Sequence, residues 1–208
     1  WILWNLLEGQ PHLTDWTNAS RTLLYNIRTI KWDEELLCAF GAPRAMLPEV
    51  RSSQSHFGWL RKDILGKRLP VSAVCGDQQA SMYGVGVRPG TTKVTYGTGT
   101  FLMQALGARF ILQPPFFTTL MPGVRRPQFA IEAKIEGSGA AIDSVLHDST
   151  RLDKALTRIA KDVEGYLSKL PFRPKSLVID GGITRDGLMV GVQEKVSGIK
   201  VRRQTTED

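Results

Sequence analysis

An aspartate at the start of an expected helix is the residue best placed to do chemistry. Asp77 follows the apolar stretch 71–75 and Gly76, and two amides, Gln78 and Gln79, come directly after it. An aspartate in this place is often a helix N-cap, whose carboxylate accepts a backbone hydrogen bond. Alternatively, Asp77 accepts a proton from a substrate hydroxyl as a general base, while Gln78 holds a neighbouring hydroxyl. The residue types leave both interpretations open.

Three glycine-bearing turns follow strand-like stretches and have the composition of phosphate-binding turns. They lie at residues 97–99 (Gly-Thr-Gly), 137–139 (Gly-Ser-Gly) and 180–182 (Asp-Gly-Gly). Aligned backbone N–H groups in such turns bind anionic groups, and glycine lets a flat ligand approach the backbone. The Thr98 hydroxyl adds a hydrogen-bond donor. The sequence contains neither GxxxxGK[ST] nor a helix-opening GxGxxG, so neither of those two nucleotide-binding classes is indicated.

Metal, disulfide and membrane classes are not supported by the composition. The chain has three histidines, His12, His56 and His147, and two cysteines, Cys38 and Cys75, all far apart in sequence. This spacing matches no zinc site and no disulfide framework. Apolar runs are also shorter than the roughly 20 residues that a membrane helix needs. We therefore expect no protein-held metal and no membrane partner.

The formal net charge of +7 over 208 residues raises the question of a polyanionic partner. Basic residues occur in short groups with acidic or apolar neighbours, and no run of five or six is present. Solvated surfaces account for this pattern, so we expect no nucleic-acid partner. Strong salt-dependent retention on DNA would revive that alternative.

Periodicity predicts the elements that would position these residues. Leu152, Leu156, Ile159, Val163 and Leu167 recur at helical spacing, with a capping box expected at Thr150 and Asp153. A hairpin is expected around residues 97–99, with strands at 91–96 and 100–104. Further predicted elements are a helix at 33–40, a buried strand at 71–75, strands at 116–120, 129–135, 176–180 and 199–203, and a helix at 185–196.

The chain divides into two parts of different composition. All five tryptophans lie within the first 59 residues. The Arg-Pro-Gly turn at residues 88–90 has the composition of a linker. We therefore expect two bodies that meet near residues 87–90.

Five ordered blocks resemble the FGGY family of carbohydrate kinases. They are Thr14-Asp15-Trp16-Thr17-Asn18-Ala19-Ser20-Arg21-Thr22, Met46-Leu47-Pro48-Glu49-Val50, Gly76-Asp77-Gln78-Gln79-Ala80, Thr95-Tyr96-Gly97-Thr98-Gly99 and Asp180-Gly181-Gly182. Their order and rough spacing match the family over nearly the whole chain. The TNASRT, GDQQA and TYGTG versions resemble the glycerol kinases of this family more than the xylulose or gluconate kinases.

The resemblance implies an α/β fold of the actin-like, Hsp70-like ATPase class, which is ribonuclease H-like, here partial and with two lobes. It assigns residues 1–88 to the C-terminal part of the family's N-terminal substrate domain. Residues 89–208 would be a partial C-terminal, nucleotide-binding domain. By the same resemblance, the protein is a cytoplasmic transferase of glycerol metabolism that forms a homodimer or a tetramer.

The resemblance also implies ATP-dependent phosphorylation of glycerol to glycerol 3-phosphate. Asp77 would be the general base and would bind the polyol together with Gln78. Thr98, Gly139 and Gly182 would border ATP or ADP. Mg²⁺ and backbone amides would stabilise the transferred phosphoryl group without a covalent protein intermediate.

Several departures from the family pattern lead us to expect impaired activity. Asp143 and Asp186 stand where the family commonly has amides near the nucleotide, and an ionised carboxylate cannot donate a hydrogen bond. The family's DxGTTSxR phosphate loop and its Arg-Glu pair would precede Trp1. A stretch is also skipped near Ser149, and a further helix would follow Asp208. Two alternatives stay open: a non-catalytic nucleotide-binding or interaction protein derived from such a kinase, or a kinase for another polyol or sugar.

Overall fold

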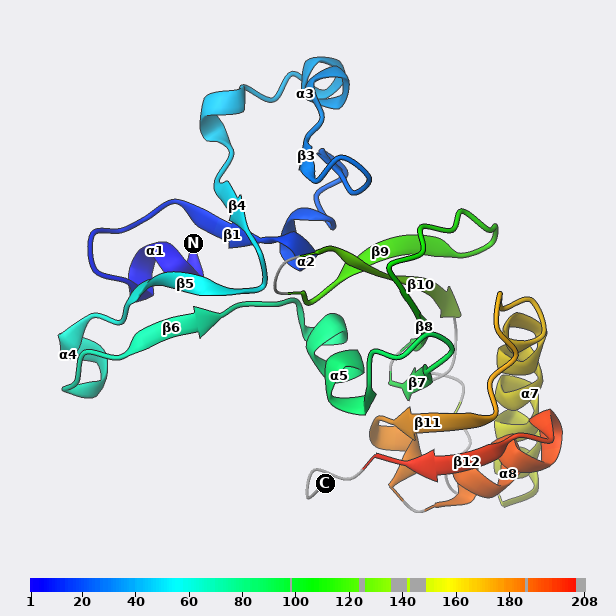
Figure 1. The fold of residues 1–208 in the computed structure, drawn as a ribbon. Helices are drawn as coiled ribbons and strands as arrows, with labels where there is room; N and C mark the ends of the chain where they lie inside the picture. The colour runs from blue at the N-terminus through cyan, green and yellow to red at the C-terminus, as the bar shows by residue number, and fades with distance from the viewer. Residues whose placement is uncertain (98, 124–125, 136–141, 143–148, 186, 205–208) are drawn as a thin grey trace. The chain divides into compact units, whose positions relative to one another are not determined.

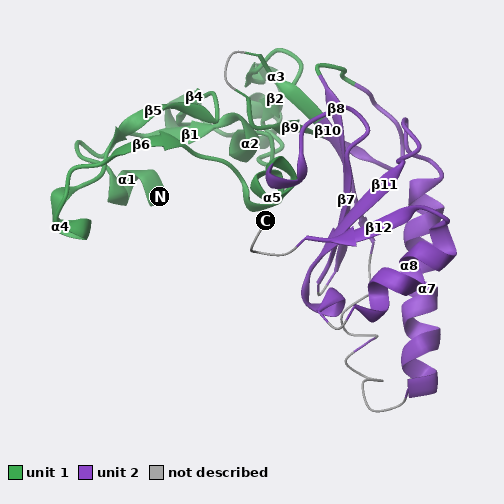
Figure 2. Ribbon diagram, turned by 60° about the horizontal axis from the view of Figure 1, so that its bottom comes forward, with its two compact units in different colours: residues 1–83, 108–110, 119–129 green, residues 84–107, 111–118, 130–208 purple. Residues whose placement is uncertain are grey.

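A computed structural model of the chain describes residues 1–97, 99–123, 126–135, 142, 149–185 and 187–204 (Figure 1). The chain forms two compact units (Figure 2). The first unit comprises residues 1–83, 108–110 and 119–129, and the second comprises residues 84–107, 111–118 and 130–208. The units are defined by contacts within the fold, so the assignment of 1–88 and 89–208 to family domains stays a prediction.

The first unit consists of small paired strands connected by short helices. Strand β1 is parallel to β4, whereas β2 with β3 and β5 with β6 form antiparallel pairs. The elements are α1 (Ile2–Leu6), β1 (Leu13–Asp15), α2 (Trp16–Ala19), β2 (Tyr25–Asn26), β3 (Lys31–Trp32), α3 (Glu34–Phe40), the 3-10 turn η1 (Arg44–Met46), β4 (Glu49–Arg51), β5 (Gln54–Trp59), α4 (Lys62–Leu65), β6 (Pro70–Ala73) and α5 (Asp77–Val85).

Local sequence signals explain some of these elements and fail for others. The predicted helix at 33–40 is confirmed as α3, and the side chain of Asp33 accepts the N–H of Leu36 at its start. The expected buried strand at 71–75 is wrong in two respects. It is β6, which ends at Ala73 and is largely exposed, because its antiparallel partner β5 is the other strand of a two-stranded sheet.

The second unit is built on a six-stranded sheet of order β12-β11-β7-β8-β10-β9. Strand β11 is parallel to both β12 and β7, and β7 forms a hairpin with β8. Helix α7 packs against α8, and α8 packs against β12 (Figure 1). The elements are β7 (Thr92–Tyr96), β8 (Thr100–Gly107), β9 (Phe117–Met121), β10 (Gln128–Ile135), α7 (Ser149–Leu167), β11 (Ser176–Asp180), the 3-10 turn η2 (Gly182–Thr184), α8 (Leu188–Ser197) and β12 (Lys200–Arg203); β9 and β10 each include residues of both units.

The amphipathic helix predicted from apolar spacing is confirmed as α7, whose buried residues are Leu156, Ile159, Ala160, Val163 and Leu167. Thr150 lies inside this helix, so the predicted capping box is wrong. The last helix begins at Leu188, three residues later than expected. Gly187 has φ +78°, a left-handed conformation that interrupts a right-handed helix at this point.

Within the described residues, no helix combines the length and the apolarity that crossing a bilayer requires.

Candidate functional site

Asp77 is the first residue of α5 and its side chain is exposed. The carbonyl of Gly76 accepts the N–H of Ala80 at 2.8 Å, so the helix hydrogen bonding begins at Gly76. The Asp77 carboxylate accepts the N–H of Gln78 at 2.7 Å. Asp77 is therefore inside the helix rather than its N-cap, and its carboxylate is accessible to a solute.

Gly76 is required by a close approach of a side chain. A Cβ at this position would lie 2.6 Å from Oε1 of Gln79. Gln79 is only 2% exposed, and its Nε2 donates to the Thr119 hydroxyl at 3.2 Å. The Gln79 side chain thus covers Gly76 and is itself held in place.

A buried carboxylate lies behind this turn. Asp15 is 0% exposed and accepts the N–H and hydroxyl of Thr17, the N–H and side-chain amide of Asn18, and the hydroxyl of Ser53, at 2.6–3.1 Å. The Thr17 hydroxyl in turn accepts the N–H of Gly76 at 2.8 Å. Hydrogen bonds therefore connect a residue of the TDWTNASRT block to the residue before Asp77.

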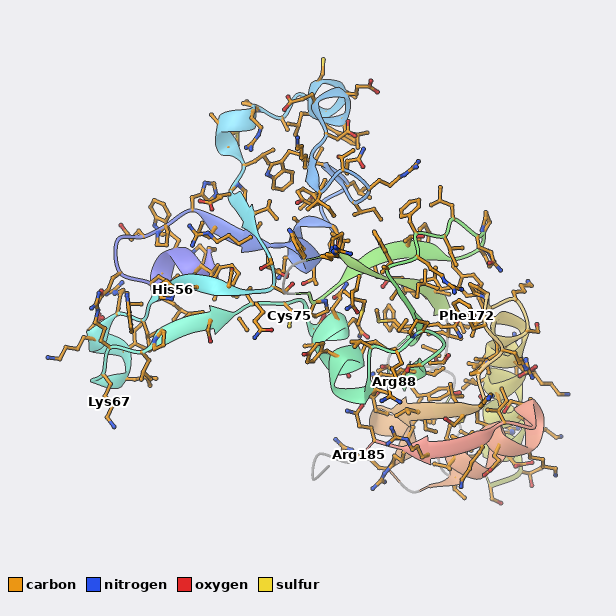
Figure 3. All side chains as sticks on the ribbon, viewed as in Figure 1. His56, Lys67, Cys75, Arg88, Phe172 and Arg185 are labelled. Carbon is orange, nitrogen blue, oxygen red and sulfur yellow. The ribbon has the colours of Figure 1, made fainter. Side chains whose placement is uncertain are left out.

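The thiol of Cys75 lies next to the same turn, between β6 and α5 (Figure 3). The side chain is partly buried. Burial raises the pKa of this thiol, and the negative charge of Asp15 raises it further. The negative charge of Asp15 therefore acts on the thiol of Cys75, the residue before Gly76.

In the second unit, Gly181 brings the ends of two strands together. Its φ is +100°, and a Cβ there would lie 2.1 Å from the carbonyl oxygen of Tyr96. In the register of β11 with β7, Asp180 pairs with Thr95. The Asp-Gly-Gly turn therefore lies directly against the start of the Gly-Thr-Gly turn, and only glycine fits.

An ion pair between Lys93 and Asp180 joins the two strands that lead into these turns. Lys93 is 2% exposed, and its Nζ is 2.9 Å from Oδ1 and 2.8 Å from Oδ2 of Asp180. The same ammonium group donates to the Thr95 hydroxyl. Because a buried charge is costly without a partner, the pair stabilises the contact between the start of β7 and the last residue of β11.

Tyr96 adds a buried polar contact to the same region. Its hydroxyl donates to the side-chain carbonyl of Gln193 on α8. Burial raises the pKa of Tyr96 strongly, so the hydroxyl stays protonated and remains a donor.

The structure locates some predicted site residues and leaves others undescribed. Asp77 and Gln78 are adjacent on α5 in the first unit, and Gly182 opens η2 in the second unit. A Cβ at Gly182 would meet no atom within 4 Å, so its backbone is open. Thr98, Gly139, Asp143 and Asp186 lie outside the described residues. Sequence reasoning missed Asp15 and Lys93, since neither shows a functional spacing.

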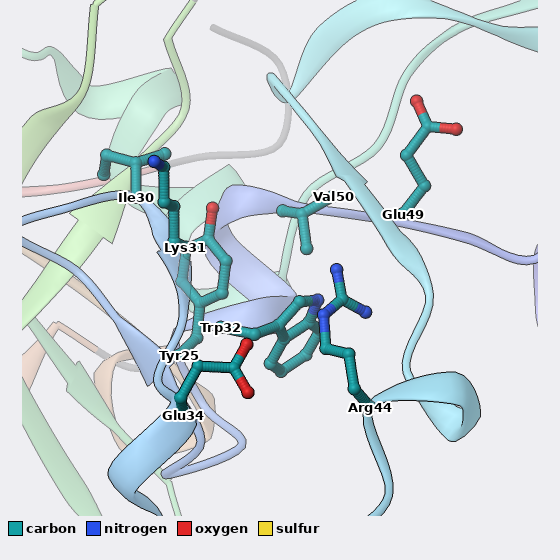
Figure 4. Close-up of a pocket in the computed structure, with 8 residues that line it drawn as sticks. All are labelled: Tyr25, Ile30, Lys31, Trp32, Glu34, Arg44, Glu49 and Val50. Carbon is teal, nitrogen blue, oxygen red and sulfur yellow. The ribbon is translucent and has the colours of Figure 1, made fainter. Parts of the chain in front are cut away.

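A separate cavity of about 500 Å³ lies in the first unit (Figure 4). It contains none of the predicted site residues. Burial raises the pKa of the lining residue Tyr25 to about 12, and Trp32 donates its indole N–H to the carbonyl of Pro48 at 3.0 Å. The charged side chains at its wall are two of each sign: Lys31, Arg44, Glu34 and Glu49.

Among the residues that the structure describes, no three His, Cys, Asp or Glu side chains come together in a way that could hold a metal ion.

Residues 1–84 match the family described as the FGGY family of carbohydrate kinases, N-terminal domain. The chain is 40% identical to the glycerol kinase of Brachyspira hyodysenteriae (strain ATCC 49526 / WA1) over 82% of its own length and 34% of that protein. It is 36% identical to the glycerol kinase of Trichodesmium erythraeum (strain IMS101) over 95% of its length and 44% of that protein. The chain thus spans between about a third and less than half of these relatives.

Solved structures agree on the fold. The glycerol kinase of Plasmodium falciparum with ADP superposes with a TM-score of 0.88 at 23% identity, covering 100% of this chain and 54% of that one. A ligand-bound xylulose kinase from Lactobacillus acidophilus gives a TM-score of 0.77 at 11% identity, covering 97% and 54%. The expected α/β fold of the carbohydrate kinases, actin-like and partial, is confirmed.

Proposed function

The chain belongs to the FGGY family of carbohydrate kinases through residues 1–84, and we propose that it phosphorylates glycerol to glycerol 3-phosphate with ATP. The observation that carries this proposal is the exposed carboxylate of Asp77 at the start of α5. It belongs to the GDQQA block of a chain that is 40% identical to a glycerol kinase over 82% of its length.

In the proposed reaction, Asp77 accepts the proton of a primary hydroxyl of glycerol. The hydroxyl oxygen attacks the γ-phosphorus of ATP, a new P–O bond forms, and the bond to the β–γ bridging oxygen breaks. ADP leaves with the electron pair of that bond. The amide of Gln78 binds a second hydroxyl and orients the polyol, because phosphoryl transfer depends mainly on positioning and charge stabilisation.

The nucleotide is proposed to lie against glycine-rich backbone. Gly182 supports this assignment, because its open surface leaves room for a ligand. Thr98 and Gly139 are assigned to the same site by family resemblance. Asp143 and Asp186 stand where the family commonly has amides, so two potential hydrogen-bond donors are lost. We therefore expect this chain to bind the nucleotide more weakly than a relative that has amides at these positions.

Mg²⁺ is part of the same proposal. The described residues offer exposed carboxylates such as Asp77 but no cage of three acidic or imidazole ligands. Mg²⁺ commonly keeps waters and substrate phosphates as ligands and needs few protein groups. The donor set therefore fits an ion bound mainly through ATP, where it neutralises phosphoryl charge.

Asp77→Asn tests the proposed base. This variant keeps the shape of the side chain and removes the acceptor for the proton, so ATP-dependent glycerol phosphorylation falls at least about a hundredfold. Asp63→Asn is the matched control, because Asp63 is an exposed aspartate of the same unit, paired with Arg61, and it keeps the rate within about twofold. Equal rates for Asp77→Asn and the unchanged chain would rule out the base assignment.

Three further measurements test the alternatives and the expected impairment. Calorimetric titration with ADP and Mg²⁺ that detects binding without turnover would favour a non-catalytic nucleotide-binding protein. Turnover on xylulose or gluconate in place of glycerol would redirect the substrate assignment. A rate equal to that of a complete glycerol kinase would contradict the impaired activity expected from the departures. The homodimer or tetramer and the cytoplasmic location stay predictions.

A further inference from the structure

Asp15 has more hydrogen bonds than the local structure around it explains. As the N-cap of α2 it accepts the N–H groups of Thr17 and Asn18, which is the usual function of an N-cap aspartate. It also accepts the Ser53 hydroxyl at 2.6 Å, across 38 positions of sequence. Helix capping does not account for this third partner.

The Thr17 hydroxyl extends the network to the turn that precedes α5. A hydroxyl has one hydrogen to donate, and that of Thr17 is directed to Asp15 at 2.8 Å. Its lone pairs are then oriented to accept, and Gly76 supplies its N–H at 2.8 Å. The carboxylate of Asp15 thus sets the orientation of the acceptor that binds Gly76.

Ser53 provides a second connection between Asp15 and the same segment. Its side chain donates to Asp15, while its backbone carbonyl accepts the N–H of Val74 at 2.9 Å. Asp15 is therefore linked to both ends of the short segment 74–76, once through Thr17 and once through Ser53. In each link the hydrogen bond to Asp15 has a charged acceptor and is stronger than a neutral one, while the bonds that reach Gly76 and Val74 join neutral groups.

Gly76 is held on both of its backbone polar groups. Its N–H is bound by Thr17, and its carbonyl accepts the N–H of Ala80 in α5. Because both the N–H and the carbonyl of Gly76 are hydrogen-bonded, the orientation of its backbone is fixed, and with it the position of the next residue, Asp77. A shift of about 1 Å in a reacting group costs about a hundredfold in rate, so this position matters to a base.

We propose that Asp15, acting through Thr17 and Ser53, is a positioning residue that fixes the Gly76–Asp77 turn and thereby the Asp77 carboxylate. The effect of this positioning on catalysis rests on the proposed function, because that function makes Asp77 the base. The hydrogen bonds that hold the turn do not depend on it. Asp15 itself is buried, so it does not touch the substrate.

Thr17→Val is the sharpest test, because valine keeps the shape of threonine and loses the hydroxyl. The amide exchange of Gly76, followed by NMR, accelerates about tenfold in this variant, as expected for the loss of its hydrogen bond to the Thr17 hydroxyl. Thr17→Ser keeps the hydroxyl and restores protection to within about threefold. If the Gly76 exchange rate is unchanged in Thr17→Val, the proposal is overturned.

Thr22→Val is the matched control. The Thr22 hydroxyl donates to the carbonyl of Ala19 at 2.7 Å and accepts the N–H of Leu24 at 3.2 Å, so it has the same double role near the other end of α2. Its loss speeds the exchange of Leu24 and leaves Gly76 protected. Acceleration at Gly76 in Thr22→Val would mean general loosening of the segment and would count against the proposal.

A kinetic readout separates positioning from a purely structural contribution. Thr17→Val lowers kcat for glycerol about tenfold or more, with KM for ATP unchanged, and Thr17→Ser rescues kcat. Faster Gly76 exchange with unchanged kcat would overturn the positioning role. If the unchanged chain transfers no phosphoryl group, the proposed function fails, and the exchange of Gly76 in Thr17→Val and of Val74 in Ser53→Ala then decides whether this network holds the turn.

Should Thr17→Val fail to fold, Ser53→Ala tests the proposal through the second link, which runs from Asp15 through Ser53 to Val74. It removes one donor to Asp15 and leaves the Thr17–Gly76 bond in place. The amide of Val74 accelerates more than that of Gly76 in this variant. No change at either amide would overturn the proposal.

Discussion

The turns at Gly76 and Gly181 both bring a glycine close to a neighbouring group, but they differ in that group and in the buried charge nearby. Each follows a strand-like segment, each has a neighbouring atom closer to the position of a Cβ than a normal contact allows, and each has a buried charged group nearby. At Gly76 the close neighbour is the end of the Gln79 side chain, and the buried charge is Asp15, which is surrounded by neutral donors. At Gly181 the neighbour is the backbone of Tyr96, and the buried charge is Lys93, paired with Asp180.

The difference between the two buried charges affects their surroundings. The Lys93–Asp180 pair is neutral as a unit, so little of its field extends beyond it. Hydrogen-bond donors stabilise Asp15 without cancelling its charge, and the pKa of Cys75 is raised by that charge as well as by burial. The first turn therefore lies in a negative field, whereas the second lies over a neutral pair.

The largest effect is expected where the glycine contacts backbone. Gly181→Ala places a Cβ 2.1 Å from the Tyr96 carbonyl in a left-handed backbone conformation. We expect a loss of more than about 4 kcal/mol in the free energy of unfolding, or no folding of the second unit. Chemical denaturation followed by circular dichroism measures this.

Gly76→Ala is the companion of that variant and is expected to be milder. The clashing atom is the end of a side chain, Oε1 of Gln79, which can rotate away at the cost of its bond to Thr119. A loss of about 1–2 kcal/mol is expected. If the two alanine variants are equally destabilised, the contrast between side-chain and backbone neighbours is wrong.

An intermediate effect is expected from breaking the ion pair. Lys93→Met keeps the length of the side chain and leaves Asp180 without its cation, which costs about 3 kcal/mol in the free energy of unfolding. The double variant Lys93→Met with Asp180→Leu recovers part of this loss, because no uncompensated charge remains. If the double variant is less stable than Lys93→Met alone, the uncompensated charge does not explain the loss, and the side chain of Asp180 stabilises the fold in another way.

The smallest effect concerns the reactivity of Cys75. A raised pKa means less thiolate at a given pH, so iodoacetamide reacts more slowly with Cys75 than with the exposed Cys38. Asp15→Asn removes the negative charge and weakens the hydrogen bonds that hold the segment 74–76, and both changes lower the pKa of Cys75 and move its alkylation midpoint to lower pH. Cys38 serves as the internal reference. A midpoint that stays in place would mean that the charge of Asp15 does not reach the thiol.

The sequence predicted the elements whose signals are local and periodic. The apolar spacing that ends at Leu167 gave α7, and β-branched residues around a glycine turn gave the β7–β8 hairpin. The predictions failed where partners distant in sequence decide the outcome. The burial of β6 depends on what covers its sheet, and the start of α8 depends on the backbone conformation of Gly187.

The same distinction applies to the site. Their place after an apolar stretch and a glycine pointed to Asp77 and Gln78, and the resemblance of motifs added to it. The exposure of Asp77 is compatible with chemistry, and the roles of both residues stay predictions. Asp15 was noted only as a member of the block at residues 14–22 that resembles the family. Lys93 stands in a strand where a lysine usually faces solvent. Their partners Ser53 and Asp180 are 38 and 87 positions away, and single-sequence patterns do not report such pairings.

The separation of 59 positions between Thr17 and Gly76 also bears on the order of folding. Contacts that close long loops form late, because the chain must lose much conformational entropy before they stabilise it. Helices α2 and α5 can begin from neighbouring residues, but the hydrogen bond between Thr17 and Gly76 must wait until the strands between them are paired. The geometry of the Asp77 turn is therefore among the last features of the first unit to become native, and it is expected to be among the first to be lost under mild denaturation.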